Sequence, residues 1–316
     1  MADLLPKLPG PVERKLYKTG QTRGATTSLI YQNRVLRNST VLIPYAFRDR
    51  CAPPEGEAFE KGGIVLVRPA EYFDQKDEFE ASGLRLGHDA LLFYETRPEW
   101  ERWRPDAVGL GVARSRLDPL GGEFVARIPG TTGAETPPIR EGFTATNSRG
   151  AGIRVYEYAS ARTIARTRLH LEALMWSCHD AIPALGSEMG IKSATARKQH
   201  AERTADFEGL LDRGRMASAR MINSDGHCIC PLCLEPMSAE VFAEKIRQAE
   251  GRAKVDNTVT ETSLFHIDEL RLGEYGHRPY NVGWGHHHCN VVAKDAGIAP
   301  TLEWMSEVLD RNLTDS

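Results

Sequence analysis

The chain has 316 residues and a formal net charge of −3, so it is long enough for two domains but is not a nucleic-acid polycation as a whole. Hydrophobic residues make up 41% of it, which is enough for a sizeable core. The N-terminal segment lacks the apolar stretch of a secretory signal, and no apolar run approaches the roughly 18 residues of a membrane helix. We therefore expect a cytoplasmic protein without membrane partners.

Residues 1–150 are predicted to form a β-rich domain with mixed strand directions that ends in a linker. Gly, Pro and charged residues separate short apolar or alternating runs at 26–36, 39–47, 62–73, 89–96, 107–115 and 122–128. From 129 to 152 periodicity is lost and Gly, Pro, Thr and Ser accumulate. Basic residues outnumber acidic ones over positions 1–50, which suits a part that recognises DNA.

Residues 151–222 are predicted to be helical. Leu171, Leu174, Met175 and Cys178 recur at the spacing of one buried helix face. In the stretch 181–204 a short turn with glycine separates two helices, and the second helix is rich in Lys, Arg, Gln and His. This pattern is typical of a helix-turn-helix in which Ile191 packs inside, although an ordinary pair of packed helices has the same pattern.

Residues 223–316 hold four of the chain's six cysteines and six of its ten histidines. Three of the six cysteines fall between 228 and 233, which in a cytosolic chain indicates metal binding rather than disulfides. Cys230 and Cys233 form a CxxC pair, and His286 and Cys289 form an HxxC pair. Together they supply the four sulfur and nitrogen ligands of a structural zinc ion. Cys228 is an alternative zinc ligand to Cys230, but its spacing to Cys233 fits less well the tight turn of a zinc knuckle, which presents two thiolates to one ion.

The sequence around these pairs predicts two strands followed by a helix. The runs 260–270 and 280–285 have strand character, and the turn-forming stretch 273–279 lies between them. A helix is predicted from 286 to 296, and a further helix at 301–309. The result is a ββα unit fastened by a zinc knuckle.

This unit resembles the HNH, or ββα-metal, endonuclease family in its zinc-containing subgroup, which includes several restriction enzymes. The resemblance covers about residues 226–300. It rests on Cys230, Cys233, His266, Asp268, Asn281, His286, Cys289 and Asn290. It implies an α+β chain in three parts: the β-rich domain, the helical segment, and a zinc-bound nuclease domain at 223–316.

The resemblance also implies roles for individual residues. Asp268 and Asn290 are expected to hold a catalytic divalent ion, Mg²⁺ or Mn²⁺, and Asn281 to fix the loop between the strands. A hard cation of this kind takes oxygen ligands and leaves places for water and a phosphate oxygen. The implied activity is metal-dependent hydrolysis of phosphodiester bonds in double-stranded DNA, by a restriction-type enzyme that is sequence-specific or modification-dependent.

One position departs from the family pattern. The family usually has its histidine base directly after the acidic strand residue, where this chain has Glu269. His266 is our preferred base, because side chains two apart on a strand point to the same side and His266 therefore accompanies Asp268. Glu269 itself is an alternative base or metal ligand. A base from elsewhere is the third alternative, and the candidates are His277, His287 and His288.

Other functions remain compatible with the sequence. If the site no longer cleaves DNA, the chain is a zinc-stabilised DNA-binding protein. Such a protein would use the helices of 181–204 to recognise DNA. A structure-selective nuclease, acting on branched or single-stranded DNA, is another alternative. For the restriction-type enzyme we expect a homodimer, because each site cuts one strand and two-fold symmetry matches a palindrome.

Overall fold

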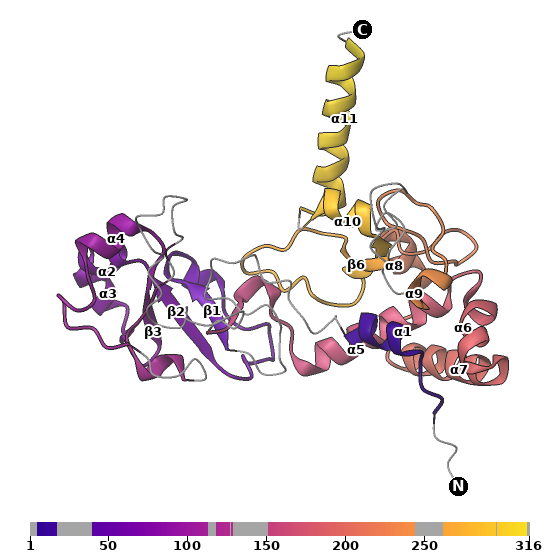
Figure 1. The fold of residues 1–316 in the computed structure, drawn as a ribbon, viewed down its shortest axis with the longest axis horizontal. Helices are drawn as coiled ribbons and strands as arrows, with labels where there is room; N and C mark the ends of the chain where they lie inside the picture. The colour runs from indigo at the N-terminus through magenta and orange to yellow at the C-terminus, as the bar shows by residue number, and fades with distance from the viewer. Residues whose placement is uncertain are drawn as a thin grey trace, which may run out of the picture. The chain divides into compact units, whose positions relative to one another are not determined.

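The computed structural model describes residues 5–17, 40–112, 118–126, 128, 151–243, 262–294 and 296–314. Its contacts divide the chain into two compact units, one made of Met1–Thr19 with Ala161–Ser316 and the other of Gly20–Ser160. Figure 1 shows a sheet unit, in violet and purple, and a mainly helical unit. Within the described ranges, no helix is both long and apolar enough to cross a lipid bilayer.

The sheet unit is built on five strands in the order β4-β3-β2-β1-β5. They are β1 (Val41–Pro44), β2 (Gly63–Val67), β3 (Ala90–Tyr94), β4 (Phe124–Ala126) and β5 (Ile153–Arg154). The sequence predicts mixed strand directions, but every pairing among these five strands is parallel. The prediction of a mixed sheet is therefore wrong for the part of the domain that the structure describes.

Burial on both faces explains the parallel arrangement. In β3, Leu91 and Phe93 belong to one apolar cluster, whereas Ala90, Leu92 and Tyr94 belong to another. A strand covered on both sides has a continuous apolar run, which is the usual sequence of a parallel strand. Short helical segments lie between the strands: η2 (Tyr45–Arg50), α2 (Pro69–Phe73), α3 (Lys76–Ala81), α4 (Arg97–Arg102) and η3 (Pro119–Gly121), with η5 (Val155–Glu157) after β5.

Some predicted strands are shorter than expected or absent. The run 62–73 stops being a strand at Val67, because Pro69 begins α2 and Glu71 accepts a hydrogen bond from the backbone of Arg68. The described part of the run 107–115 is a turn with one isolated bridge from Val112 to Phe124. The run 26–36 and most of the predicted linker at 129–152 lie outside the described residues.

The helical unit combines the two ends of the chain. Its helices are α1 (Gly10–Tyr17), α5 (Ala161–Trp176), α6 (Ala181–Met189), α7 (Ile191–Phe207), α8 (Arg213–Ser218), α9 (Glu240–Ala243), α10 (His287–Ala293) and α11 (Ile298–Thr314). Within the segment predicted to be helical, 151–222, helices α5 to α8 cover much of 161–218, whereas Ile153–Arg154 forms strand β5 of the sheet unit. Strands β6 (Thr262–His266) and β7 (Val282–His286) form a separate antiparallel pair.

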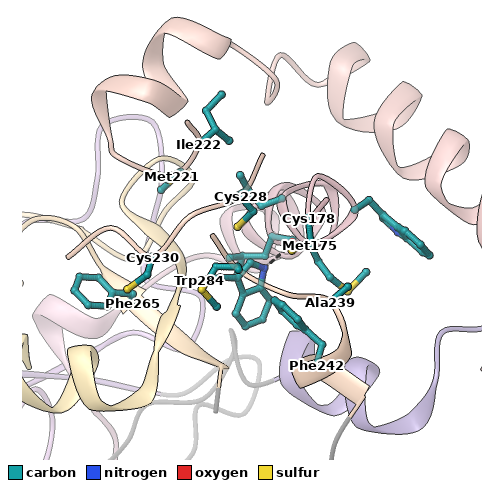
Figure 2. Packing of buried hydrophobic residues seen from close by; sticks show 14 of the residues in the cluster. Met175, Cys178, Met221, Ile222, Cys228, Cys230, Ala239, Phe242, Phe265 and Trp284 are labelled. Atoms are coloured by element: carbon teal, nitrogen blue, oxygen red, sulfur yellow. Dashed lines mark hydrogen bonds between the residues drawn. The ribbon is translucent and has the colours of Figure 1, made fainter. Parts of the chain in front are cut away.

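One hydrophobic core joins these elements. Trp284 of β7 is 1% exposed, and its indole N–H donates a 2.8 Å hydrogen bond to the backbone carbonyl of Leu171 in α5. The ring of Phe242 meets Trp284 edge-on at 4.9 Å. Figure 2 shows Met175 of α5, and Cys178 just after that helix, in the same cluster. The long helix α5 is therefore the support on which β7 is held in place.

Candidate active site and metal centre

The ββα unit forms as the sequence predicts. Strands β6 and β7 pair in antiparallel register from Thr262 opposite His286 to His266 opposite Val282, and α10 packs against both strands. Glycine at 285 is required by this pairing, because an added Cβ would lie 2.7 Å from the ring of Phe265. Phe265 is fully buried, so its ring has no room to move aside.

The four predicted zinc ligands lie together at one end of this unit. The ligand atoms of Cys230, Cys233, His286 and Cys289 all lie within 4.8 Å of one another. Cys233 Sγ is 3.3 Å from His286 Nδ1. Tetrahedral zinc with Zn–S distances of about 2.3 Å requires ligand atoms about 3.3–3.8 Å apart, so small movements suffice to close the set. The cluster can therefore hold a zinc ion.

Local backbone structure presents these ligands. Cys230 and Cys233 lie in a tight turn in which the N–H of Leu234 donates to the carbonyl of Cys230 at 2.8 Å. Leu234 adopts a positive φ of 64°, which reverses the chain after the second thiol. On the other side, β7 ends at His286 and α10 begins at once, so that Cys289 lies in the first turn of a helix.

The cysteine thiols differ in their protonation. Burial raises the pKa of Cys230, but hydrogen bonds from the His286 side chain and from backbone N–H groups outweigh it and lower the pKa to about 6. The hydrogen bond to Cys230 raises the pKa of His286. Burial raises the pKa values of Cys233 and Cys289. A thiolate is thus available at Cys230 before metal binds, and metal binding has to displace protons from the other two thiols.

Cys228, the alternative ligand, is placed elsewhere. It is 1% exposed and its backbone N–H donates to the carbonyl of Ser177 at 3.3 Å. Its thiol contacts that of Cys178 at the end of α5, and the two are shown together in Figure 2. Cys228 is not one of the four residues whose ligand atoms gather, so the structure favours Cys230 as the ligand.

The loop between β6 and β7 carries the predicted acidic residues and is held by Asn281. Asn281 is buried, its Oδ1 accepts from the N–H of Asp268 at 2.7 Å, and its Nδ2 donates to the carbonyl of Gly276 at 2.8 Å. Asp268 is exposed. Glu269 is half-buried and its carboxylate pairs with Arg271 at 2.5 Å.

Gly297 is a contributor to this loop that the sequence reasoning missed. It has φ +82°, and an added Cβ would lie 2.8 Å from the Glu269 backbone nitrogen and 2.9 Å from the Ile267 oxygen. Its neighbour Ile298 donates from its backbone N–H to the carbonyl of Ile267 at 2.9 Å. The start of α11 therefore lies directly against the backbone of Asp268. A glycine ahead of a predicted helix is only a weak signal of this contact.

The candidate bases occupy different surroundings. His266 Nε2 lies 3.4 Å from His277 Nδ1, and burial together with the His277 charge lowers the pKa of His266 to about 3. His287 has a buried Nδ1 without a hydrogen-bond partner among the described residues. His288 is exposed and its Nε2 is 3.3 Å from Cys289 Sγ. Asn290 is half-buried on α10, directly after Cys289.

The predicted helix-turn-helix is a pair of helices joined at Gly190, which has φ +83°. Ile191 does not pack inside as expected, because it is 54% exposed, although part of its side chain lies against Gly186. Arg197 is also unavailable for DNA, since Glu172 binds its guanidinium at 2.6 and 2.9 Å. An exposed face remains on α7, formed by Lys192, Gln199, His200 and Arg203.

A second missed feature fastens the β6–β7 loop to the helices. Tyr280 has φ +67°, and its ring contacts the His170 ring, at 4.7 Å, and the guanidinium of Arg215, at 3.9 Å. Its hydroxyl donates to the carbonyl of Gly209 at 3.1 Å. Because Tyr280 precedes Asn281, this contact also fixes the residue that holds Asp268. In the sequence, only the position of Tyr280 directly before Asn281 indicates that this tyrosine contributes to the loop.

A model of a known protein family matches most of the chain. The family described as BstXI restriction endonuclease matches residues 14–287, which is most of the chain and includes Cys230, Cys233, Asp268, Asn281 and His286. No curated protein and no solved structure matches. Because the match spans well over half of the residues and both compact units, the chain belongs to the BstXI restriction endonuclease family.

Proposed function

We propose that the chain is a metal-dependent DNA endonuclease of HNH type that acts in restriction. Membership of a restriction endonuclease family supports DNA as the substrate and phosphodiester hydrolysis as the reaction. The observation that carries the HNH assignment is the Cys₃His cluster at the β7–α10 corner of a ββα unit whose loop between the strands carries Asp268. Zinc in this cluster has a structural role, because four protein ligands leave no open position.

Asp268 and Asn290 are the proposed ligands of the catalytic ion. Bound Mg²⁺ or Mn²⁺ supplies positive charge to the scissile phosphate and makes a bound water more acidic. Asp268 is exposed, and Asn281 fixes its backbone. Asn290 follows a zinc ligand, so that zinc binding fixes the start of α10 and with it the position of the amide. In this proposal, the zinc cluster and Asn281 orient the two metal-binding side chains from opposite sides.

We keep His266 as the proposed general base. Its low pKa leaves it neutral at pH 7, as a proton acceptor must be, and His277 orients its ring. Phosphate near His266 stabilises its protonated form and strengthens it as a base. Glu269 is the weaker candidate because Arg271 already binds its carboxylate. Replacing His266, Glu269 and His277 singly by Ala separates these candidates by the size of the loss in cleavage rate.

The test is cleavage of methylated and unmethylated plasmid and phage DNA with Mg²⁺ or Mn²⁺. Wild-type protein is expected to give discrete fragments. Asn290→Ala is expected to abolish them while zinc content and thermal stability stay unchanged, and Asn312→Ala, on the exposed side of α11, serves as the matched control. Cleavage by Asn290→Ala at the wild-type rate would sink the assignment of the catalytic ion.

The same experiment decides between the alternatives. DNA binding without nicking in any divalent metal supports a zinc-stabilised DNA-binding protein, for which Glu269 at the usual base position is the main argument. Preferential cutting of a four-way junction over a linear duplex supports a structure-selective nuclease. We further propose a homodimer, in which each protomer cuts one strand, and light scattering of the free and DNA-bound protein measures this directly.

A further inference from the structure

The surface around Tyr280 presents two arginines without an acidic partner. Arg215 of α8 and Arg278 of the β6–β7 loop are both exposed. Neither guanidinium has an ion pair within the described part of the chain, whereas Arg271 in the same loop is paired with Glu269. An unpaired arginine on the surface is available to an anionic partner.

Tyr280 connects these two arginines, one by contact with its ring and one by its place in the chain. The Arg215 guanidinium lies 3.9 Å from the centre of the Tyr280 ring, and Arg278 is two residues before Tyr280 in the same tight turn. The backbone N–H groups of Asn281 and Val282 both donate to the carbonyl of Arg278, at 3.2 and 3.1 Å. These hydrogen bonds hold the backbone of the turn, so less backbone entropy is lost when a ligand binds to it.

The arrangement also fixes the Arg215 head group. The cation–π contact holds the guanidinium over the Tyr280 ring, and the His170 ring contacts the same tyrosine at 4.7 Å. A guanidinium that rests on a ring can still offer N–H groups to two oxygens of one phosphate.

We propose that Arg215 of α8 and Arg278 of the loop that carries Asp268 form a site for the phosphodiester backbone of DNA. The inference rests on the proposed function and adds the contact that places the backbone relative to that loop. Phosphate contacts position the duplex and carry no sequence information. The site therefore contributes equally to binding of specific and nonspecific DNA.

The test measures DNA affinity by fluorescence anisotropy, with Ca²⁺ in place of Mg²⁺ so that no cleavage is needed. Affinities are taken over a salt series for wild type, Arg215→Ala, Arg278→Ala and the double variant. Each single change is expected to lower affinity roughly tenfold, the loss of one charge-assisted hydrogen bond. Each is also expected to reduce the slope of log K against log[salt] by about 0.9.

Two controls keep the result specific. Arg311→Ala removes an exposed arginine of α11 that is paired with Glu307, and it is expected to change neither affinity nor slope. Arg215→Lys keeps the charge and is expected to keep the slope. Zinc content and melting temperature are measured for every variant, so that a loss of folding is recognised.

Different results would overturn the phosphate site and the proposed nuclease function. Unchanged affinity and slope in the folded double variant overturn the phosphate site, whatever the protein cleaves. A loss confined to one DNA sequence also overturns it, because a backbone contact acts on all sequences alike. A wild-type protein that binds DNA through these arginines but never cuts it leaves the site standing and removes the nuclease assignment.

Discussion

At the scale of single residues, His170 couples the helices to the candidate catalytic loop. It is fully buried on α5, and its Nδ1 accepts from the N–H of Tyr280 at 3.5 Å. Burial, aided by the Arg215 charge, lowers its pKa from 6.5 to about 4. The folded protein therefore keeps His170 neutral at pH values at which the unfolded chain already binds a proton.

This difference predicts a specific sensitivity to acid. The free energy of unfolding should fall as pH falls from about 6.5 towards 4, by at most about 1.4 kcal/mol per pH unit for this one group. His170→Asn, which keeps an acceptor near the Nδ1 position, should remove that part of the slope, while the exposed His200→Asn should not. Urea denaturation at several pH values measures the slopes. Parallel slopes for wild type and His170→Asn would contradict the prediction.

Two glycines of β7 make a matched pair. An added Cβ at 285 lies 2.7 Å from the fully buried Phe265, whereas at 283 it meets the flexible Met221 side chain at 3.4 Å. We expect Gly285→Ala to destabilise the helical unit by about 1–3 kcal/mol through overpacking, and Gly283→Ala to cost clearly less. Denaturant unfolding followed by tryptophan fluorescence compares them. Equal losses for the two variants would mean that strand pairing adapts at Phe265.

At the scale of elements, the ββα unit was predictable because its signals are local. Ligand pairs such as Cys230 with Cys233 are set by one tight turn, and short strands follow from alternation over a few residues. The order of the strands in the parallel sheet was not predictable in the same way. A continuous apolar run such as Ala90–Tyr94 does not determine which strands lie beside it in the sheet. Contacts between distant segments, such as that of Gly297 with the backbone of Asp268, leave no pattern at all.

The Cys₃His cluster yields a prediction about metal. Purified protein should contain one zinc ion per chain by mass spectrometry, and Cys233→Ser or Cys289→Ser should lower zinc content and melting temperature together. Cys51→Ser, which changes a buried thiol of the sheet unit, is the control and should leave zinc content unchanged. Full zinc occupancy in Cys289→Ser would show that another residue completes the site.

At the scale of the whole molecule, the two compact units are not consecutive in sequence. Helix α1 near the N-terminus packs in the core of the helical unit, where Val12 is fully buried and Lys15 donates to the carbonyl of Val241 at 3.2 Å. The sequence predicted domain boundaries near 150 and 222 from changes in composition. Helix α1 is too short to change the local amino-acid composition. The sequence therefore does not show that it packs in the core of the helical unit, and only the structure does.

This organisation predicts that damage to either core stays within its own unit. Leu16→Ala in α1 and Leu92→Ala in β3 each remove a buried leucine and should cost about 2–5 kcal/mol. Leu16→Ala should speed hydrogen exchange in α5, α9 and β7, far along the chain, but not in the sheet. Leu92→Ala should do the reverse. Because exchange reports the cooperative unit that opens, faster exchange in both units after either change would mean that the chain unfolds as one body.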